Sequence, residues 1–270
     1  MVALFFVFGA LFGSFLNVVA IRYNTGKGLH GRSRCASCGK GLLWFEFVPI
    51  ISFFALRGRC FTCKSALSIQ YPLVEGATAL IFCGVYLVSS GALEILFSLV
   101  LFSLLIVIAV YDIRHAIIPD GLVYAFSGLA FIQMWVSPSS LSFLVPSSTN
   151  MLAGVVVALP FFLLWLLSSG RWIGLGDAKL SLGTGWFLGM SGGGSALILA
   201  FWIGAFVSVA LLAYESIRHA QRRRGRTPAL NSEHKRFTMK SEVPFAPFII
   251  LGILLVYFFD INVIELAMFS

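Results

Sequence analysis

The chain has 270 residues, of which 59% are hydrophobic and only 11% are charged, and its formal net charge is +8. So few polar groups cannot cover a soluble globule, and the mean hydropathy of +0.95 indicates a polytopic membrane protein. The positive charge favours a topology signal and contacts with anionic membrane lipids, and it does not call for nucleic acid as a partner.

We expect an all-α protein with about eight transmembrane helices, because eight apolar stretches are each long enough to span a bilayer. They run over roughly 2–20, 73–89, 93–111, 121–137, 150–168, 179–196, 197–217 and 244–262. The first has no basic residues before it, so we interpret it as a retained anchor. Its Gly9 and Gly13 form a GxxxG pattern, which is typical of close helix packing.

The 19 lysines and arginines are segregated among the connections. Residues 21–72 hold eight and residues 218–243 hold eight, and the other three are Arg114, Arg171 and Lys179. By the positive-inside rule, these segments face the cytoplasm and both termini face outward. The chain therefore divides into a first helix at 1–20, a cytoplasmic segment at 21–72 and a bundle at 73–270 with a basic loop at 218–243.

The cytoplasmic segment contains two CxxC pairs, Cys35 with Cys38 and Cys60 with Cys63. Two such pairs can close on one tetrahedral zinc ion, which would stabilise a small subdomain that has little core of its own. Disulfide bonds are the alternative, and a cytoplasmic location argues against them. Four thiolates leave no open coordination position, so we predict a structural zinc ion.

Two groups of basic residues have more than one interpretation. In the cytoplasmic segment, three side chains could face phospholipid or acidic residues of a substrate: Arg57, Arg59 and Lys64. The four arginines between 222 and 226 are typical of a solvated cluster beside a membrane, and docking of a protein partner is the alternative.

Two aspartates lie in matched positions, each at one end of a long apolar run. Asp112 follows residues 105–110 at the end of a helix, where a carboxylate opposes the helix dipole. Asp177 follows Gly174-Leu-Gly, which leaves room for an extended peptide. Burying such groups is costly and usually serves function, and two carboxylates together favour activation of water through a shared proton.

Polar residues near these aspartates have less specific predicted roles. Pro119 prevents simple continuation of the helix after Asp112, and Asp120 is expected to cap the next helix. Lys179 is interpreted as an interfacial anchor, with stabilisation of ionised Asp177 as the alternative. Glycines of the sixth segment, including Gly183 and Gly185, predict close packing inside the bundle, and a mobile gate is the alternative.

The chain resembles the bacterial type IV prepilin peptidases. The motifs that carry the resemblance are Asp112 with Ile118-Pro119-Asp120, the GxGD sequence at 174–177, the double CxxC and Gly13-Ser-Phe-Leu-Asn-Val-Val. The resemblance implies a GxGD aspartic endopeptidase of the bacterial inner membrane, in which Asp112 and Asp177 cut the basic leader of a prepilin or pseudopilin at the cytoplasmic face. Proteins that assemble pili or secretion systems are further implied partners.

The same resemblance implies N-methylation of the new N-terminal residue, with S-adenosylmethionine as the donor. The residues that match at this second activity are Gly13, Asn17, Arg22, Tyr71, Pro72 and Glu75. Glu75 has its own physical argument, because an acid inside a helix could contact a cationic amine or sulfonium; a dipole-favoured acid near a helix start is the alternative. The chain departs from the family pattern at Tyr23-Asn24, where Leu-Pro is common, and at Ala246, where glycine is usual.

Two other classes of protein fit part of the pattern. A zinc-regulated transporter would also use paired intramembrane acids, but both acids lie at one face and no inverted repeat is visible. A scaffold for assembly, which recruits partners through the zinc-binding segment and the basic loop, is the third hypothesis.

Overall fold

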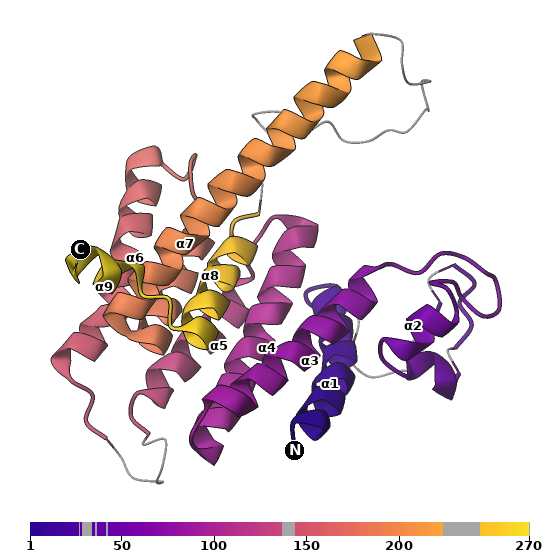
Figure 1. The fold of residues 1–270 in the computed structure, drawn as a ribbon, viewed down its shortest axis with the longest axis horizontal. Helices are drawn as coiled ribbons and strands as arrows, with labels where there is room; N and C mark the ends of the chain where they lie inside the picture. The colour runs from indigo at the N-terminus through magenta and orange to yellow at the C-terminus, as the bar shows by residue number, and fades with distance from the viewer. Residues whose placement is uncertain are drawn as a thin grey trace.

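The computed structural model describes residues 1–26, 28, 34, 35, 37–41, 43–136, 144–223 and 244–269. Within them the chain is helical, with two isolated β-bridges and no β-strand, so the predicted all-α class is confirmed (Figure 1). In chain order the elements are α1 (Val2–Arg22), the 3₁₀-helix η1 (Trp44–Phe47), α2 (Ile51–Ala55), α3 (Gln70–Val88), α4 (Ala92–His115), α5 (Asp120–Gln133), α6 (Ser148–Ser168), α7 (Leu175–Arg223), α8 (Ala246–Phe259) and α9 (Val263–Phe269).

Among the described residues, five helices are long and apolar enough to cross a membrane: α1, α3, α4, α6 and the Leu175–Tyr214 part of α7. By contrast, α5 and α8 have only 14 residues each. At 1.5 Å per residue they are about 21 Å long, which is less than the ~30 Å of a bilayer core. Helices occupy all the predicted apolar stretches, but the count of eight spans stays a prediction.

The N-terminal part of the bundle is a close pair formed by α1 and α3. A Cβ atom on Gly9 would lie 2.7 Å from the Ala79 Cα atom, and one on Gly13 would lie 2.8 Å from the Glu75 Cα atom. Both positions therefore need glycine for the two backbones to approach. In lipid, such van der Waals contact replaces the hydrophobic effect as the force that joins helices.

The first part of α7 is surrounded by other helices. Gly183 lies against the Phe126 ring of α5, and Gly185 lies against the Ala153 carbonyl of α6; in both cases an added Cβ atom would approach to 2.6 Å. The predicted packing of this glycine-rich segment inside the bundle is therefore confirmed. It fixes the helix that begins with the GxGD sequence between two neighbours.

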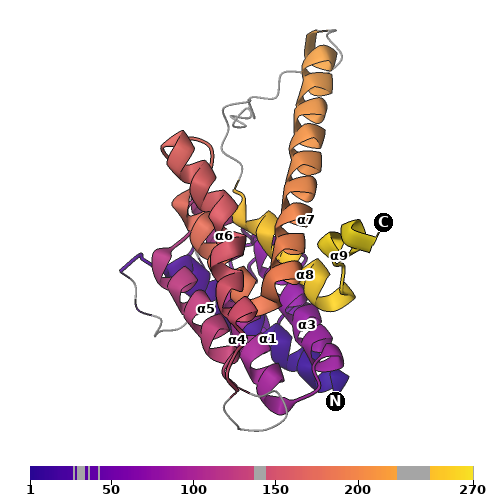
Figure 2. The same cartoon turned by 90° about the vertical axis from the view of Figure 1, so that its left-hand side faces the viewer.

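A kink divides α7 where two separate helices were predicted. Gly189 has a φ of 77° and a ψ of −175° inside otherwise helical backbone, a conformation that glycine alone adopts without strain. The predicted boundary at 196 and 197 is therefore wrong. After the kink, α7 continues to Arg223 and projects beyond the other helices in both views (Figures 1 and 2). The predicted loop at 218–243 thus begins within a helix, and its residues 224–243 lie outside the described residues.

Aromatic side chains join α4, α7 and α8 in the interior of the bundle, and the one from α4, Phe102, lies ten residues before Asp112. The Phe102 ring centroid lies 5.0 Å from that of Tyr257 and 5.6 Å from that of Phe187. The Tyr257 hydroxyl donates to the Ser98 Oγ atom at 2.9 Å, which satisfies the one polar atom of the cluster. This packing holds α8 against α4, and it thereby sets where the first residues of α8 lie.

Candidate active site and metal centre

Asp112 lies in the last turn of α4, with only 3% of its surface exposed. The helix ends at Ala116, whose backbone is left-handed and whose N–H donates to the Asp112 carbonyl oxygen at 2.7 Å. The carboxylate Oδ2 atom accepts the backbone N–H of Ala246, the first residue of α8, at 3.2 Å. The positive end of α8 therefore offsets the unfavourable position of a carboxylate at the end of α4.

Asp177 lies in the first turn of α7, with 8% of its surface exposed. Its Oδ1 atom is buried and has no hydrogen-bond partner among the described residues. The segment that carries Asp112 approaches Asp177 at Ile118, which lies against Gly176. A buried carboxylate oxygen without a donor disfavours a negative charge, and a second acid nearby disfavours it further. The arrangement therefore favours a pair of acids that holds one proton.

Gly176 forms the contact between the segments that carry the two aspartates. A Cβ atom at this position would lie 2.8 Å from the Ile118 Cβ atom, in the turn between α4 and α5. This turn begins only a few residues after Asp112, and Gly176 immediately precedes Asp177. The missing side chain therefore allows the two aspartates to approach each other.

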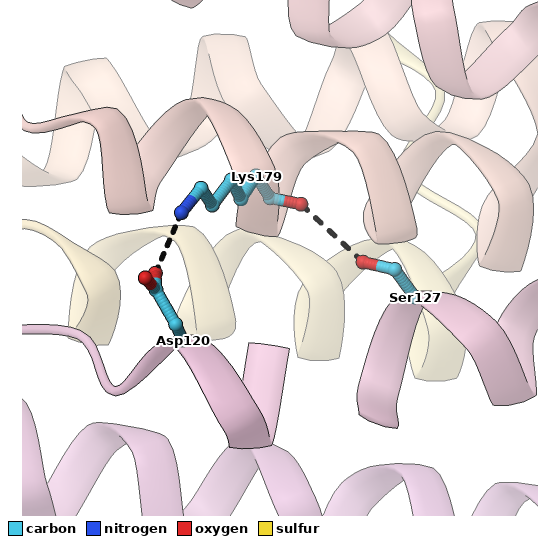
Figure 3. Close-up of polar contacts among 3 residues, drawn as sticks. All are labelled: Asp120, Ser127 and Lys179. Carbon is cyan, nitrogen blue, oxygen red and sulfur yellow. Dashed lines mark hydrogen bonds and ion pairs between the residues drawn. The ribbon is translucent and has the colours of Figure 1, made fainter. Parts of the chain in front are cut away.

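The predicted N-terminal cap at Asp120 is wrong. Pro119 occupies the cap position, Asp120 is the first residue of α5, and its side chain accepts no hydrogen bond from the first turn. The carboxylate pairs instead with the Lys179 Nζ atom at 2.7 Å (Figure 3). Lys179 also lies 4.9 Å from the Tyr124 ring centroid, and its carbonyl accepts the Ser127 hydroxyl at 3.4 Å. Its ion pair thus joins the starts of α5 and α7.

The four cysteines of the 21–72 segment converge on one point. Their Sγ atoms all lie within 4.8 Å of one another, and those of Cys35 and Cys63 are 3.8 Å apart. Four thiolates placed tetrahedrally at ~2.3 Å from zinc would be ~3.8 Å apart, so the cluster fits a zinc ion. The thiols are free and form no disulfide.

Each CxxC pair is held in a knuckle by the same local hydrogen bonds. The Cys35 N–H donates to the Lys40 carbonyl, and the Cys35 carbonyl accepts the Gly39 N–H, both at 2.9 Å. In the second knuckle, the Cys60 N–H donates to the Ser65 carbonyl at 2.9 Å, and the Cys60 carbonyl accepts the Lys64 N–H at 3.0 Å. The residue after the second cysteine has a positive φ in both knuckles, 70° in the first and 58° in the second. The ligand geometry is therefore local.

Hydrogen bonds within the knuckles also favour the thiolate form of two of the cysteines, whereas burial and the neighbouring sulfurs raise the pKa of Cys38 to about 11. The backbone N–H groups of Cys38 and Ser37 lower the pKa of Cys35 to about 6. The pKa of Cys63 is lowered as well, first by the hydroxyl of Ser65, which lies 3.1 Å from its sulfur. Because zinc binds thiolates, both effects suit a metal site.

Of the six residues that the resemblance assigns to methyl transfer, Gly13, Asn17, Tyr71 and Glu75 lie together where α1 crosses α3. Gly13 packs against Glu75, and the Asn17 Nδ2 atom donates to the carbonyls of Gly13 and Tyr71, each at 3.3 Å. Asn17 is fully buried, and Glu75 has 6% of its surface exposed. Arg22 lies at the end of α1, where it donates to the Gly28 carbonyl at 3.0 Å.

The structure adds partners to these residues that sequence reasoning missed. The Arg114 Nε atom donates to the Gln70 Oε1 atom at 2.7 Å, and the Gln70 Nε2 atom donates to the Asn17 Oδ1 atom at 3.2 Å. The Glu75 Oε2 atom accepts the backbone N–H of Ile50 at 2.8 Å. These contacts join distant parts of the chain, so no local pattern signals them.

Two family models match successive parts of this chain. The model described as the bacterial peptidase A24 N-terminal domain matches residues 7–89, and that of the type IV leader peptidase family matches residues 99–209. A prepilin leader peptidase/N-methyltransferase of Klebsiella pneumoniae is 33% identical over 212 residues, which cover 72% of this chain and 88% of that relative. The chain belongs to the type IV leader peptidase family. The resemblance seen in its motifs is thereby confirmed.

Two further relatives carry the same name. That of Bacillus subtilis is 27% identical over 266 residues, or 98% of this chain and 97% of the relative. That of Myxococcus xanthus is 37% identical over 156 residues, which cover 57% of this chain and only 39% of the relative. No solved structure matches the chain. The relatives give no support to a transporter.

Proposed function

We propose that this chain is a membrane-embedded aspartic endopeptidase that cleaves the leader of type IV prepilins or pseudopilins and N-methylates the new N-terminal residue. The observation that supports the peptidase activity is the presence of two buried carboxylates at the end of α4 and the start of α7, on segments that touch at Ile118 and Gly176. Membership of the leader peptidase family supports both activities, because the relatives are named for both.

In the proposed reaction Asp112 is the ionised base and Asp177 is the protonated acid. The Ala246 N–H stabilises negative charge on Asp112, whereas Oδ1 of Asp177 has no such donor within the described residues. Asp112 takes a proton from water as the water oxygen bonds to the scissile carbonyl carbon, and Asp177 gives its proton to the carbonyl oxygen. The C–N bond then breaks: Asp112 protonates the leaving amine, and Asp177 regains its proton from the intermediate's hydroxyl. No covalent enzyme intermediate forms.

We place this site at the cytoplasmic face of the bacterial inner membrane. The charge distribution supports this placement. When successive connections alternate between the two sides of the membrane, the basic segments 21–72 and 218–243 fall on the same side as Asp112 and Asp177. A substrate with a short basic leader would have its cleavage site at the same face. Proteins that assemble the pilus or the secretion system would receive the product there.

We assign a structural zinc ion to the 21–72 segment, held by Cys35, Cys38, Cys60 and Cys63. Zinc bound there would cross-link the two knuckles and supply folding free energy to a segment with a small core. The cysteines fill a tetrahedral shell, so the peptidase reaction takes no step at this centre. Each of the four sulfurs acts as a ligand.

For methyl transfer we propose a donor site beside the α1–α3 crossing, with S-adenosylmethionine as the donor. Glu75 supplies a carboxylate suited to a cationic amine or sulfonium, and Arg22 lies at the end of α1, five residues after Asn17. Asn17 has hydrogen bonds on both its oxygen and its nitrogen, so it holds the backbone near Gly13 and Tyr71 in place.

The decisive experiment incubates the purified chain in detergent with a prepilin, with and without S-adenosylmethionine, and measures product mass. We expect Asp112→Asn and Asp177→Asn each to abolish cleavage, because an amide can neither accept nor share the proton. The matched control is Glu94→Gln, at the opposite end of α4, which should cleave normally. Appreciable processing by either aspartate variant would exclude the two-carboxylate mechanism.

A further inference from the structure

The zinc-binding segment exposes apolar side chains that no other described part of the protein covers. The helix α2 has the sequence Ile-Ser-Phe-Phe-Ala, and none of its residues is buried. Ile51 is 67% exposed and Phe54 is 69% exposed, and because they lie three residues apart they share one side of the helix. These two residues are here called the α2 face. A fully apolar face of this kind is costly in water.

A hydrogen bond to α3 sets the depth of the α2 face. The N–H of Ile50, immediately before α2, donates to the Glu75 carboxylate at 2.8 Å. Glu75 lies five residues into α3, a helix able to span the membrane, and about 7.5 Å along its axis. Helix α2 therefore begins level with the first turns of a membrane span, and Figure 1 shows it to the right of the pair formed by α1 and α3.

The backbone before α2 is held in an unfavourable conformation to make this contact. Ile50 has a φ of 62° and a ψ of −55°, a region that a β-branched residue enters only when its surroundings enforce it. At the start of α3, the cap residue Ile69 and Leu73 in the first turn are 65% and 62% exposed, as expected for side chains that meet lipid. Exposed apolar side chains thus lie both on α2 and at the start of α3, the two segments that the hydrogen bond from Ile50 to Glu75 joins.

The charges around the α2 face select the kind of lipid. Between residues 47 and 74 the sequence has no aspartate or glutamate. Three basic residues in this range are exposed and are here called the basic edge: Arg57, Arg59 and Lys64. A basic edge beside an apolar face is the arrangement by which proteins rest on anionic bilayers, with cations at phosphates and apolar groups at the acyl-chain boundary.

We propose that the zinc-binding segment lies partly within the inner-leaflet interface, with the α2 face at the acyl-chain boundary and the basic edge against anionic phospholipid headgroups. The inference rests on the cytoplasmic placement given under the proposed function. In this arrangement two contacts hold the segment near the α1–α3 crossing: its contact with lipid and the hydrogen bond from Ile50 to Glu75.

The test measures the depth of position 54 in the full-length protein. Phe54 is replaced by p-acetylphenylalanine and labelled with a nitroxide through its ketone, which leaves the cysteines free to bind zinc. The protein is placed in nanodiscs of phosphatidylcholine and phosphatidylglycerol, and collisions with oxygen and with a water-soluble nickel chelate are compared. Leu80, which is 68% exposed on α3, serves as the lipid reference, and the exposed knuckle residue Ser37 serves as the water reference.

We expect the label at position 54 to collide with oxygen in preference to nickel, as at position 80 and opposite to position 37. A label that behaves like the one at position 37 would overturn the proposal. So would a label that becomes shielded only after a prepilin is added, because the substrate would then be the partner of the α2 face.

A second arm tests the basic edge. The combined variant Arg57→Gln, Arg59→Gln and Lys64→Gln should increase nickel access at position 54 severalfold in nanodiscs that contain phosphatidylglycerol, and have little effect in pure phosphatidylcholine. Equal access in both lipids, with and without the variant, would remove the role of anionic headgroups. Zinc content reports whether the segment is still folded. Prepilin cleavage, measured on the same samples, separates failure of this proposal from failure of the proposed peptidase.

Discussion

The metal centre and the aspartate pair are assembled over very different distances along the chain. Each half of the four-cysteine cluster is one knuckle, shaped by backbone hydrogen bonds between residues four or five positions apart. The aspartates stand on α4 and α7, 65 residues apart in the sequence, and their surroundings depend on contacts between distant segments, such as Gly176 with Ile118 and Ala246 with Asp112. The first site should therefore resist changes in the bundle, whereas the second should respond to a single added methyl group.

The largest effect, loss of the bound metal, is expected when one of the four cysteines is replaced. Cys60→Ser removes a ligand that is 3% exposed. Because structural zinc contributes on the order of 10–16 kcal/mol to the domains that it folds, we expect loss of bound zinc and rapid proteolysis of the 21–72 segment. Metal analysis and limited proteolysis of the purified protein are the measurements.

Cys83→Ser is the matched control for this experiment. Cys83 lies in α3 outside the cluster, and its sulfur contacts the Val2 carbonyl at 3.5 Å. This variant should retain zinc at the wild-type level. Full zinc occupancy in Cys60→Ser would show that the four cysteines do not form one site.

A smaller but still large effect is expected from one methyl group at the aspartate pair. In Gly176→Ala the new Cβ atom meets Ile118 at 2.8 Å, so the turn after Asp112 must move away from Asp177. A displacement of about 1 Å at reacting groups can cost on the order of 10²-fold in rate. We expect prepilin cleavage to fall by about this factor while zinc content stays unchanged.

The control for that substitution is Gly128→Ala. Gly128 also lies in a helix, α5, but an added Cβ atom there meets no heavy atom within 4 Å. It should cleave prepilin at the wild-type rate. If Gly176→Ala were equally active, the close contact with Ile118 would have no part in placing the aspartates.

The smallest effect is expected at the ion pair between α5 and α7. The Asp120 side chain is 63% exposed and that of Lys179 is 21% exposed, and exposed pairs contribute roughly 0.2–1 kcal/mol. Asp120→Asn and Lys179→Met should each slow cleavage by up to about 5-fold, since 1.36 kcal/mol corresponds to tenfold in rate. Steady-state rates on a prepilin measure this.

The double variant sharpens the same comparison. If the two side chains act as a pair, removing both should cost little more than removing one, and exchanging them in Asp120→Lys with Lys179→Asp should restore part of the rate. Fully additive losses would show that each residue acts alone, and the pair would then have no role in joining α5 to α7.

Much of this structure can be predicted from the sequence, because hydropathy, charge distribution and CxxC spacing are properties of short segments. A bilayer requires long apolar helices, positive residues remain on the cytoplasmic side, and a CxxC pair forms its knuckle without help from the rest of the chain. Predictions that depended on single boundaries were less successful. A boundary between two helices was predicted at 196 and 197, several residues after the kink at Gly189, since several glycines lie nearby and only packing selects one of them. Asp120 was assigned to a cap, although a lysine on another helix is its partner.

The amino-acid sequence by itself determined the membrane class, the family and the residues that have chemistry to offer. Only the tertiary structure decided which of these groups meet: Ala246 with Asp112, Gly176 with Ile118, and Ile50 with Glu75. The physical reason is that hydropathy and ligand spacing are properties of short segments, whereas such contacts depend on how helices far apart in the chain pack against one another.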